Sequence, residues 1–127
     1  MNENEISKIV VDSAIKLHQD LGPGLLESVY EISLMHLLQK RGLTCQRQVP
    51  IPIHYDHLKF DEGFRADLVI NDLVIIELKS VSEISPVHRK QIQTYLRLSG
   101  KKLGLLLNFG AALMRDGIVR AVNQLPE

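Results

Sequence analysis

Two segments near the start of the chain carry apolar residues at helical spacing. Between about residues 5 and 19 the apolar positions lie three or four apart, which predicts an amphipathic helix. A second helix is predicted from about 25 to 40. The glycines and the proline at 22–24 end the first helix, and Gly42 caps the second. The two predicted stripes are Ile6, Ile9, Val10, Ala14 and Leu17, and then Leu26, Val29, Tyr30, Leu34, Leu37 and Leu38.

From residue 44 onward the pattern favours strands. Residues 44–55 predict an edge-like strand with irregular pairing, because Pro50 and Pro52 cannot donate to a sheet ladder. A turn is expected at 56–59, and residues 61–63 lead into a hairpin. That hairpin joins two strongly apolar strands, 64–70 and 73–79, across the turn signal Asn71-Asp72.

The remainder of the chain predicts one helix and two strands. Ser85 and Pro86 are suited to the N-cap and first turn of a helix from 86 to about 98. Residues 102–109 form a continuous apolar run, which is typical of a strand buried on both faces. A last strand is expected over 113–122, with an internal turn at Asp116-Gly117. The order α, α, β, β, β, α, β, β predicts one α/β domain, residues 1–127, with a mixed central sheet.

Charge and hydropathy narrow the function classes. Lys plus Arg equals Asp plus Glu at 15 each, which weakens the case for tight, non-specific binding to nucleic acid. Two short basic clusters remain candidates, at 88–90 and 101–102. No apolar run approaches the roughly 20 residues that span a bilayer, and the polar start of the chain lacks the order of a signal peptide. We therefore expect a cytoplasmic protein that does not contact membranes.

The hairpin contains charges where apolar residues are expected. Asp67 lies in its first strand, and Glu77 and Lys79 lie one pleat apart in its second. Buried charges are costly unless they are paired or bind a metal. One interpretation is a site for Mg²⁺ or Mn²⁺ on Asp67, Glu77 and the backbone carbonyl of Leu78, completed by waters, with Lys79 beside it. The alternative is a buried ion pair between Lys79 and one of the acids.

The metal interpretation makes a geometric demand on the hairpin. A two-residue loop that pairs Ile70 with Leu73 would place Asp67 opposite Ile76, so that Glu77 would point away from Asp67. The two carboxylates share a face only if the register shifts by one residue. We therefore predict a three-residue connection or a β-bulge between Asp67 and Glu77.

Four polar residues on the predicted helices are further candidates. Glu27 and Tyr30 are three apart and share a face, so Glu27 borders the core. It could equally be a first-turn carboxylate that is favoured by the helix dipole. Gln91 and Tyr95 are four apart, and Gln91 could donate to a phosphate or to a metal-bound water. The alternative is a partly buried polar pair at a helix edge.

These residues together resemble a known group of proteins. The order of a helical Glu27, then Asp67, Glu77-x-Lys79 and a helical Gln91 resembles the PD-(D/E)XK nuclease superfamily. Gly24-x-x-Glu27-x-x-Tyr30 is similar to the motif of its GxxExxY family. The resemblance runs from about residue 6 to 125, although Ala66 stands where the superfamily name has a proline. It implies a restriction-endonuclease-like αβα sandwich with a mixed sheet and an extra N-terminal helix.

The resemblance also implies site roles, which are written here as expectations. Asp67, Glu77 and Leu78 would hold Mg²⁺ or Mn²⁺, and the catalytic set would be Lys79, Glu27, Gln91 and Tyr95. The implied activity is hydrolysis of phosphodiesters in DNA or RNA, with a homodimer as a way to enlarge a small footprint. The alternative is a non-catalytic or weakly catalytic nucleic-acid-binding or regulatory module on the same fold.

Overall fold

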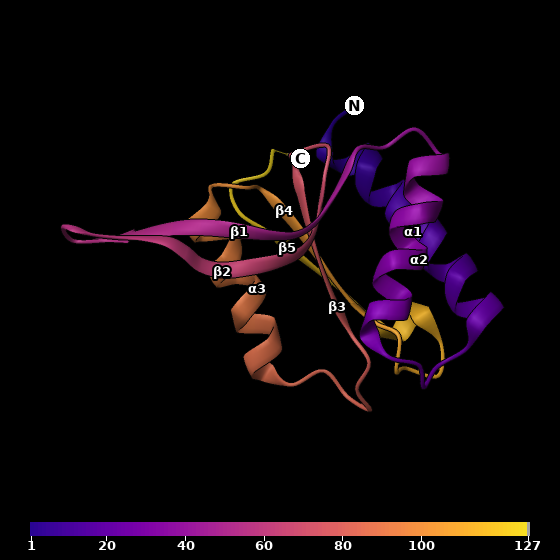
Figure 1. The fold of residues 1–127 in the computed structure, drawn as a ribbon. Helices are drawn as coiled ribbons and strands as arrows, with labels where there is room; N and C mark the ends of the chain where they lie inside the picture. Colours follow the sequence, from indigo (N-terminus) through magenta and orange to yellow (C-terminus); the bar gives the residue numbers. More distant parts are fainter. Residues whose placement is uncertain (127) are drawn as a thin grey trace.

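A five-stranded mixed sheet with helices on both faces forms the protein in the computed structural model, which describes residues 1–126 (Figure 1). Two helices, α1 and α2, cover one face, and α3 covers the other. This arrangement confirms the predicted α/β class with an additional N-terminal helix. In chain order the elements are α1 (Glu3–Leu21), α2 (Glu27–Lys40), β1 (Cys45–Tyr55), β2 (Leu58–Ile70), β3 (Val74–Lys79), α3 (Pro86–Ser99), β4 (Leu103–Asn108), the 3-10 helix η1 (Met114–Gly117) and β5 (Ile118–Val122).

The strands lie in sequence order, β1-β2-β3-β4-β5. All neighbouring pairs are antiparallel except β3 and β4, which are parallel and connected through α3. Every residue of β4 is buried, as its apolar run predicts, because helices cover both faces of the sheet at its centre. Among the described residues, no helix is long and apolar enough to cross a membrane.

Two cores lie on the two faces of the sheet. Leu68, Ile76 and Leu78 belong to the core under α1 and α2, whereas Val69 and Ile75 pack against α3. Side chains alternate along a strand, so Glu77 follows Ile75 onto the α3 face. Glu77 therefore lies on the side of the sheet that α3 covers.

Two element boundaries differ from the sequence-based prediction. β2 begins at Leu58, which pairs directly with Tyr55, so the turn is only Asp56-His57. Residues 59–63, which are mostly polar and all exposed, belong to a two-stranded arm that projects from the body (Figure 1), where an exposed strand needs no apolar alternation. β1 is an edge strand with a register shift between Ile51 and Ile53, which confirms its predicted irregularity.

The predicted strand over 113–122 is correct only in its second half. Residues from Met114 to Gly117 form the 3-10 helix η1, and β5 starts at Ile118. A Cβ on Gly117 would lie 2.5 Å from the carbonyl oxygen of Asn108, so this turn packs closely against the end of β4. The turn signal at Asp116-Gly117 therefore ends η1 instead of interrupting a strand.

Tyr30 fixes the loop between α1 and α2. Its ring is fully buried and stacks on Phe109, with ring centroids 4.4 Å apart. Its hydroxyl donates to the carbonyl of Gly22 at 2.6 Å and accepts from the backbone N–H of Leu25 at 3.0 Å. The tyrosine of the Gly24-x-x-Glu27-x-x-Tyr30 pattern thus holds the loop that leads into α2.

We expect Tyr30→Phe to destabilise the protein without changing its fold. The substitution keeps the stacked ring but removes two hydrogen bonds, to the carbonyl of half-buried Gly22 and from the N–H of exposed Leu25, each worth about 0.5–1.5 kcal/mol. Denaturant unfolding of the variant beside wild type measures the difference. An unchanged midpoint would show that the hydroxyl does not hold the loop.

The segment that follows β3 is tied to the end of β4. The side chain of Asn108, 2% exposed, donates to the carbonyl of Val81 and accepts from the N–H groups of Val81 and Gly110. A Cβ on Gly110 would lie 2.2 Å from the carbonyl oxygen of Val81, so only glycine fits this approach. The N–H of Phe109 donates to the carbonyl of Lys79. These contacts fix the backbone at Lys79.

Candidate active site

The hairpin between β2 and β3 has the predicted irregularity. Ile70 pairs with Val74 and Leu68 pairs with Ile76, so the connection contains three residues, 71–73. Asn71 and Asp72 both have positive φ, 51° and 57°, and Leu73 donates back to the carbonyl of Ile70. Asn71 and Asp72 therefore take the central positions of a type I′ turn, and Leu73 is one extra residue before the paired part of β3 begins. Continuing this register places Asp67 opposite Glu77, as the metal interpretation requires.

The carboxyl groups of Asp67 and Glu77 lie between β2 and β3 just beyond Leu68 and Ile76, the last paired residues of the two strands. The N–H of Asp67 donates to Oε2 of Glu77 at 3.1 Å, and the N–H of Leu78 donates to Oδ2 of Asp67 at 2.9 Å. In a regular antiparallel pair, these N–H groups would donate to backbone carbonyls of the neighbouring strand. The carboxylates thus replace backbone partners at the point where β2 and β3 separate, and they converge on each other.

Glu77 is the more buried of the two acids. Burial, the charge of Asp67 and a hydrogen bond shared with the carboxyl of Asp67 raise the pKa of Glu77 to about 9, while Lys79 opposes this shift weakly. Two carboxyls placed together without a cation cannot both ionise cheaply. The metal-free protein therefore holds a proton here that a bound cation would replace.

Lys79 lies on the same face of β3 as Glu77 and is half-buried. Among residues 1–126, the ion pairs within 4 Å do not join Lys79 to Asp67 or Glu77. This geometry does not support the alternative in which Lys79 exists to neutralise a buried acid. The ammonium group remains available for another partner.

The donor chemistry of the pair fits a hard divalent cation. Carboxylate oxygens and a carbonyl are the ligands that Mg²⁺ and Mn²⁺ prefer, and Mg²⁺ commonly uses one or two carboxylates and keeps several waters. Within residues 1–126 there is no group of three or more His, Cys, Asp or Glu residues arranged to hold a metal. A cation bound here would therefore have waters or substrate oxygens in most of its coordination positions.

Tyr95 lies near the two acids from the α3 side. Its ring stacks on Phe64 with centroids 3.9 Å apart. Burial raises its pKa, and the charges of Glu77 and Asp67 raise it further. Gln91, one turn earlier on α3, is exposed. The structure thus brings Tyr95 close to the acids and leaves the Gln91 side chain at the surface of the same helix.

Glu27 is the first residue of α2 and is exposed. The start of α2 lies beside the end of β3, because the hydroxyl of Ser80 donates to the carbonyl of Leu25 at 2.9 Å. The structure therefore places Glu27 at the rim of this end of the sheet and does not bring it into contact with Asp67 or Glu77. Its position also fits the dipole interpretation for a first-turn carboxylate.

β2 rotates sharply at Asp67. Residues two apart on a strand normally face the same side. Ala66, however, packs in the α3 core, and Leu68 packs in the core under α1 and α2. Across the ladder, the pairs Arg47 with Leu68 and Val49 with Ala66 place Gln48 opposite Asp67. This rotation lets groups from both faces of the sheet approach Asp67.

Glu31 is an acid near this point that the sequence analysis missed. It is 4% exposed, forms an ion pair with Arg47, and accepts from Nε2 of Gln48 at 2.8 Å. Burial raises its pKa, the charge of Asp67 raises it further, and Arg47 and the hydrogen bonds oppose the shift. A readable signal existed, because Glu31 lies three and seven residues before Leu34 and Leu38, on the apolar stripe of α2.

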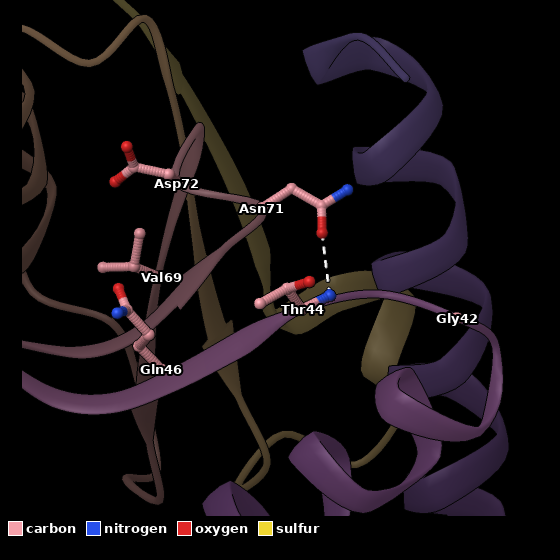
Figure 2. A pocket seen from close by; sticks show the side chains of 6 residues that line it. All are labelled: Gly42, Thr44, Gln46, Val69, Asn71 and Asp72. Carbon is pink, nitrogen blue, oxygen red and sulfur yellow. Dashed lines mark hydrogen bonds between the residues drawn. The ribbon is translucent and has the colours of Figure 1, made fainter.

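A hollow on the surface near the hairpin does not coincide with the acids. It measures about 640 Å³ and lies at the turn end of the β2–β3 hairpin (Figure 2). There the side chain of Asn71 accepts from the N–H of Thr44 at 2.8 Å. Its lining residues are Gly42, Thr44, Gln46, Val69, Asn71 and Asp72. This set contains one carboxylate and no base, so the acids define the candidate site better than the hollow does.

Comparison with known proteins gives one clear result. No curated protein and no solved structure matches this chain. The family model described as the PD-(D/E)XK nuclease superfamily matches residues 4–121, which covers the three α-helices and the five strands except for the first residue of α1 and the last residue of β5. The paired acids on a separating hairpin, with a lysine one pleat further, lie within that match. The chain belongs to the PD-(D/E)XK nuclease superfamily.

Proposed function

We propose that this protein is a Mg²⁺- or Mn²⁺-dependent nuclease that hydrolyses phosphodiester bonds in nucleic acid. The observation that carries the proposal is the shifted register of the β2–β3 hairpin, which turns Asp67 and Glu77 toward each other. A regular two-residue hairpin would have separated them. A buried Glu77 beside a half-buried Asp67 is a costly arrangement in a protein that binds no cation.

The roles follow from the positions of the groups. Asp67, Glu77 and the carbonyl of Leu78 would hold the cation, which when bound polarises a phosphate and lowers the pKa of a water. Lys79, which has no acidic partner within 4 Å in the described residues 1–126, would orient the attacking water or contact the phosphate. Tyr95 would line the site from α3, and Gln91 and Glu27 would contact substrate at its rim.

A second function on the same fold is a nucleic-acid-binding or regulatory module with little or no turnover. The balanced charge of the chain favours it, with 15 basic and 15 acidic residues. The converged acids favour the enzyme, because a binding module has no need for a buried carboxyl whose pKa is raised to about 9. We therefore place the enzyme first.

The finer assignments are part of the same proposal. Gly24-x-x-Glu27-x-x-Tyr30 supports membership of the GxxExxY family within the superfamily. The substrate would be DNA or RNA, and a homodimer would give a domain of 127 residues a larger footprint.

A cleavage panel tests the proposal. Wild type is incubated with supercoiled plasmid and with single- and double-stranded DNA and RNA oligonucleotides, in Mg²⁺, in Mn²⁺ and in excess chelator. We expect metal-dependent cleavage of at least one substrate, and loss of that cleavage in Asp67→Asn. Binding without cleavage in any metal would support the regulatory module instead.

A further inference from the structure

Gln48 has a backbone conformation that is uncommon for its residue type. Its φ is 53°, in the left-handed region, although it lies in the middle of β1. A non-glycine residue remains there only when its surroundings hold it, and such positions are concentrated at functional sites. The flanking pairs of the β1–β2 register, Arg47 with Leu68 and Val49 with Ala66, place Gln48 opposite Asp67, at the point where β2 rotates.

The side chain of Gln48 connects two acids. Its Nε2 donates to Oε1 of Glu31 at 2.8 Å and to Oδ1 of Asp67 at 3.4 Å. An amide nitrogen has two N–H groups, so one group can serve each acid. The amide cannot flip without turning its oxygen toward two carboxylates. Its orientation is therefore set by Glu31 and Asp67 together.

Glu31 is itself held in place from the other side. Its Oε2 pairs with the guanidinium of Arg47, and only 4% of the residue is exposed. Arg47 and Gln48 are consecutive residues that point to the same acid, which the unusual φ at Gln48 permits. The result is a fixed acceptor that keeps the Gln48 amide pointing at Asp67.

Both oxygens of Asp67 thereby receive a hydrogen bond. Oδ2 accepts from the N–H of Leu78 and Oδ1 accepts from Gln48. Hydrogen-bonding partners of this kind fix the orientation of metal-binding carboxylates, and their loss commonly lowers metal affinity by about 10- to 100-fold. We propose that Gln48, held by Glu31, is a positioning residue that orients the Asp67 carboxylate for a divalent cation. This inference rests on the proposed function.

The test compares two glutamines with the same backbone conformation. Gln124 also has a left-handed φ, 56°, and it is exposed in the C-terminal segment. Gln48→Met and Gln124→Met remove the same amide at a similar φ and keep a similar side-chain length. Melting temperature is followed as a function of Mn²⁺ concentration. We expect the Mn²⁺ concentration that produces a given rise in melting temperature to be about 10- to 100-fold higher in Gln48→Met and to be unchanged in Gln124→Met.

A second variant covers a loss of folding in the first. Gln48→Gly accommodates the left-handed φ and still removes the amide. It should show the same increase in the Mn²⁺ concentration needed for a given rise in melting temperature. If both Gln48 variants respond to the same Mn²⁺ concentrations as wild type, the positioning role is overturned, whether or not wild type cleaves. If wild type binds Mn²⁺ but cleaves nothing, the nuclease proposal fails. A weaker Mn²⁺ response of the Gln48 variants would still support the positioning role of Gln48. A wild type without any Mn²⁺ response overturns both.

Discussion

Glu77→Gln should stabilise the metal-free protein and abolish its response to metal. The folded state raises the pKa of Glu77 from 4.5 to about 9, so this group favours folding most when it is protonated. Wild type should therefore lose stability as pH rises from about 4.5 toward about 9, at up to about 1.4 kcal/mol per pH unit. Glutamine needs no proton to be uncharged, so the variant should be more stable than wild type at pH 8 by a few kcal/mol, on the order of the cost of keeping Glu77 protonated far above its usual pKa.

Mn²⁺ should reverse this order. A ligand that binds only the folded state raises the melting temperature by mass action, so millimolar Mn²⁺ should stabilise wild type and leave Glu77→Gln unchanged. Glu83→Gln is the matched control, because Glu83 is exposed in the segment after β3. Thermal melts at several pH values, with and without Mn²⁺, measure all three proteins. A Glu77→Gln protein that is less stable than wild type at pH 8 without Mn²⁺ would contradict the account.

Lys79→Met should remove activity and leave both the fold and the metal response intact. Methionine keeps most of the volume of the lysine stem, so packing should change little. The ammonium group has no acidic partner within 4 Å among the described residues, so its loss should cost little stability. A group that orients water or phosphate in the transition state commonly contributes about 10²- to 10⁴-fold in rate, and we expect a loss of that size.

Cleavage rates, Mn²⁺ melts and denaturant unfolding of Lys79→Met distinguish the two roles of the lysine. Lys59→Met, on the exposed arm, is the control for removing one positive charge. If Lys79 were mainly an ion-pair partner, its replacement would lower the free energy of unfolding by about 3–5 kcal/mol and would leave an unpaired acid. That loss, with retained cleavage, would reject the catalytic role.

The sequence predicted most of the sheet because burial dictates its pattern. The continuous apolar run of β4 requires cover on both faces of the sheet. In β3, the alternation of side chains places Ile75 and Glu77 on the face opposite to that of Ile76 and Leu78. The register of the hairpin was also predictable, because only a shift by one residue lets two carboxylates meet. Boundaries were less predictable where no burial constrains them, as in the arm from residue 58 to 63.

The environment of Asp67 was predictable only in part. Glu31 lies on an apolar stripe, which is a local signal, but its partners come from β1 and depend on long-range packing. The left-handed φ of Gln48 has no signature in the sequence, since glycine or asparagine normally marks such positions. The rotation of β2 at Asp67 lies beside that conformation in the neighbouring strand. Sequence spacing alone could not indicate that a residue of β1 would contact Asp67.

A structure with Mn²⁺ and a short oligonucleotide tests the central claim most directly, because manganese can be located by its anomalous scattering. The account predicts one Mn²⁺ bound by Asp67 and Glu77, with bonds of about 2.1 Å. A phosphate of the oligonucleotide should share that ion, and the Lys79 ammonium should point to it. Mn²⁺ that is absent from these acids, with Lys79 paired to Glu77 and the phosphates bound elsewhere, would contradict the account.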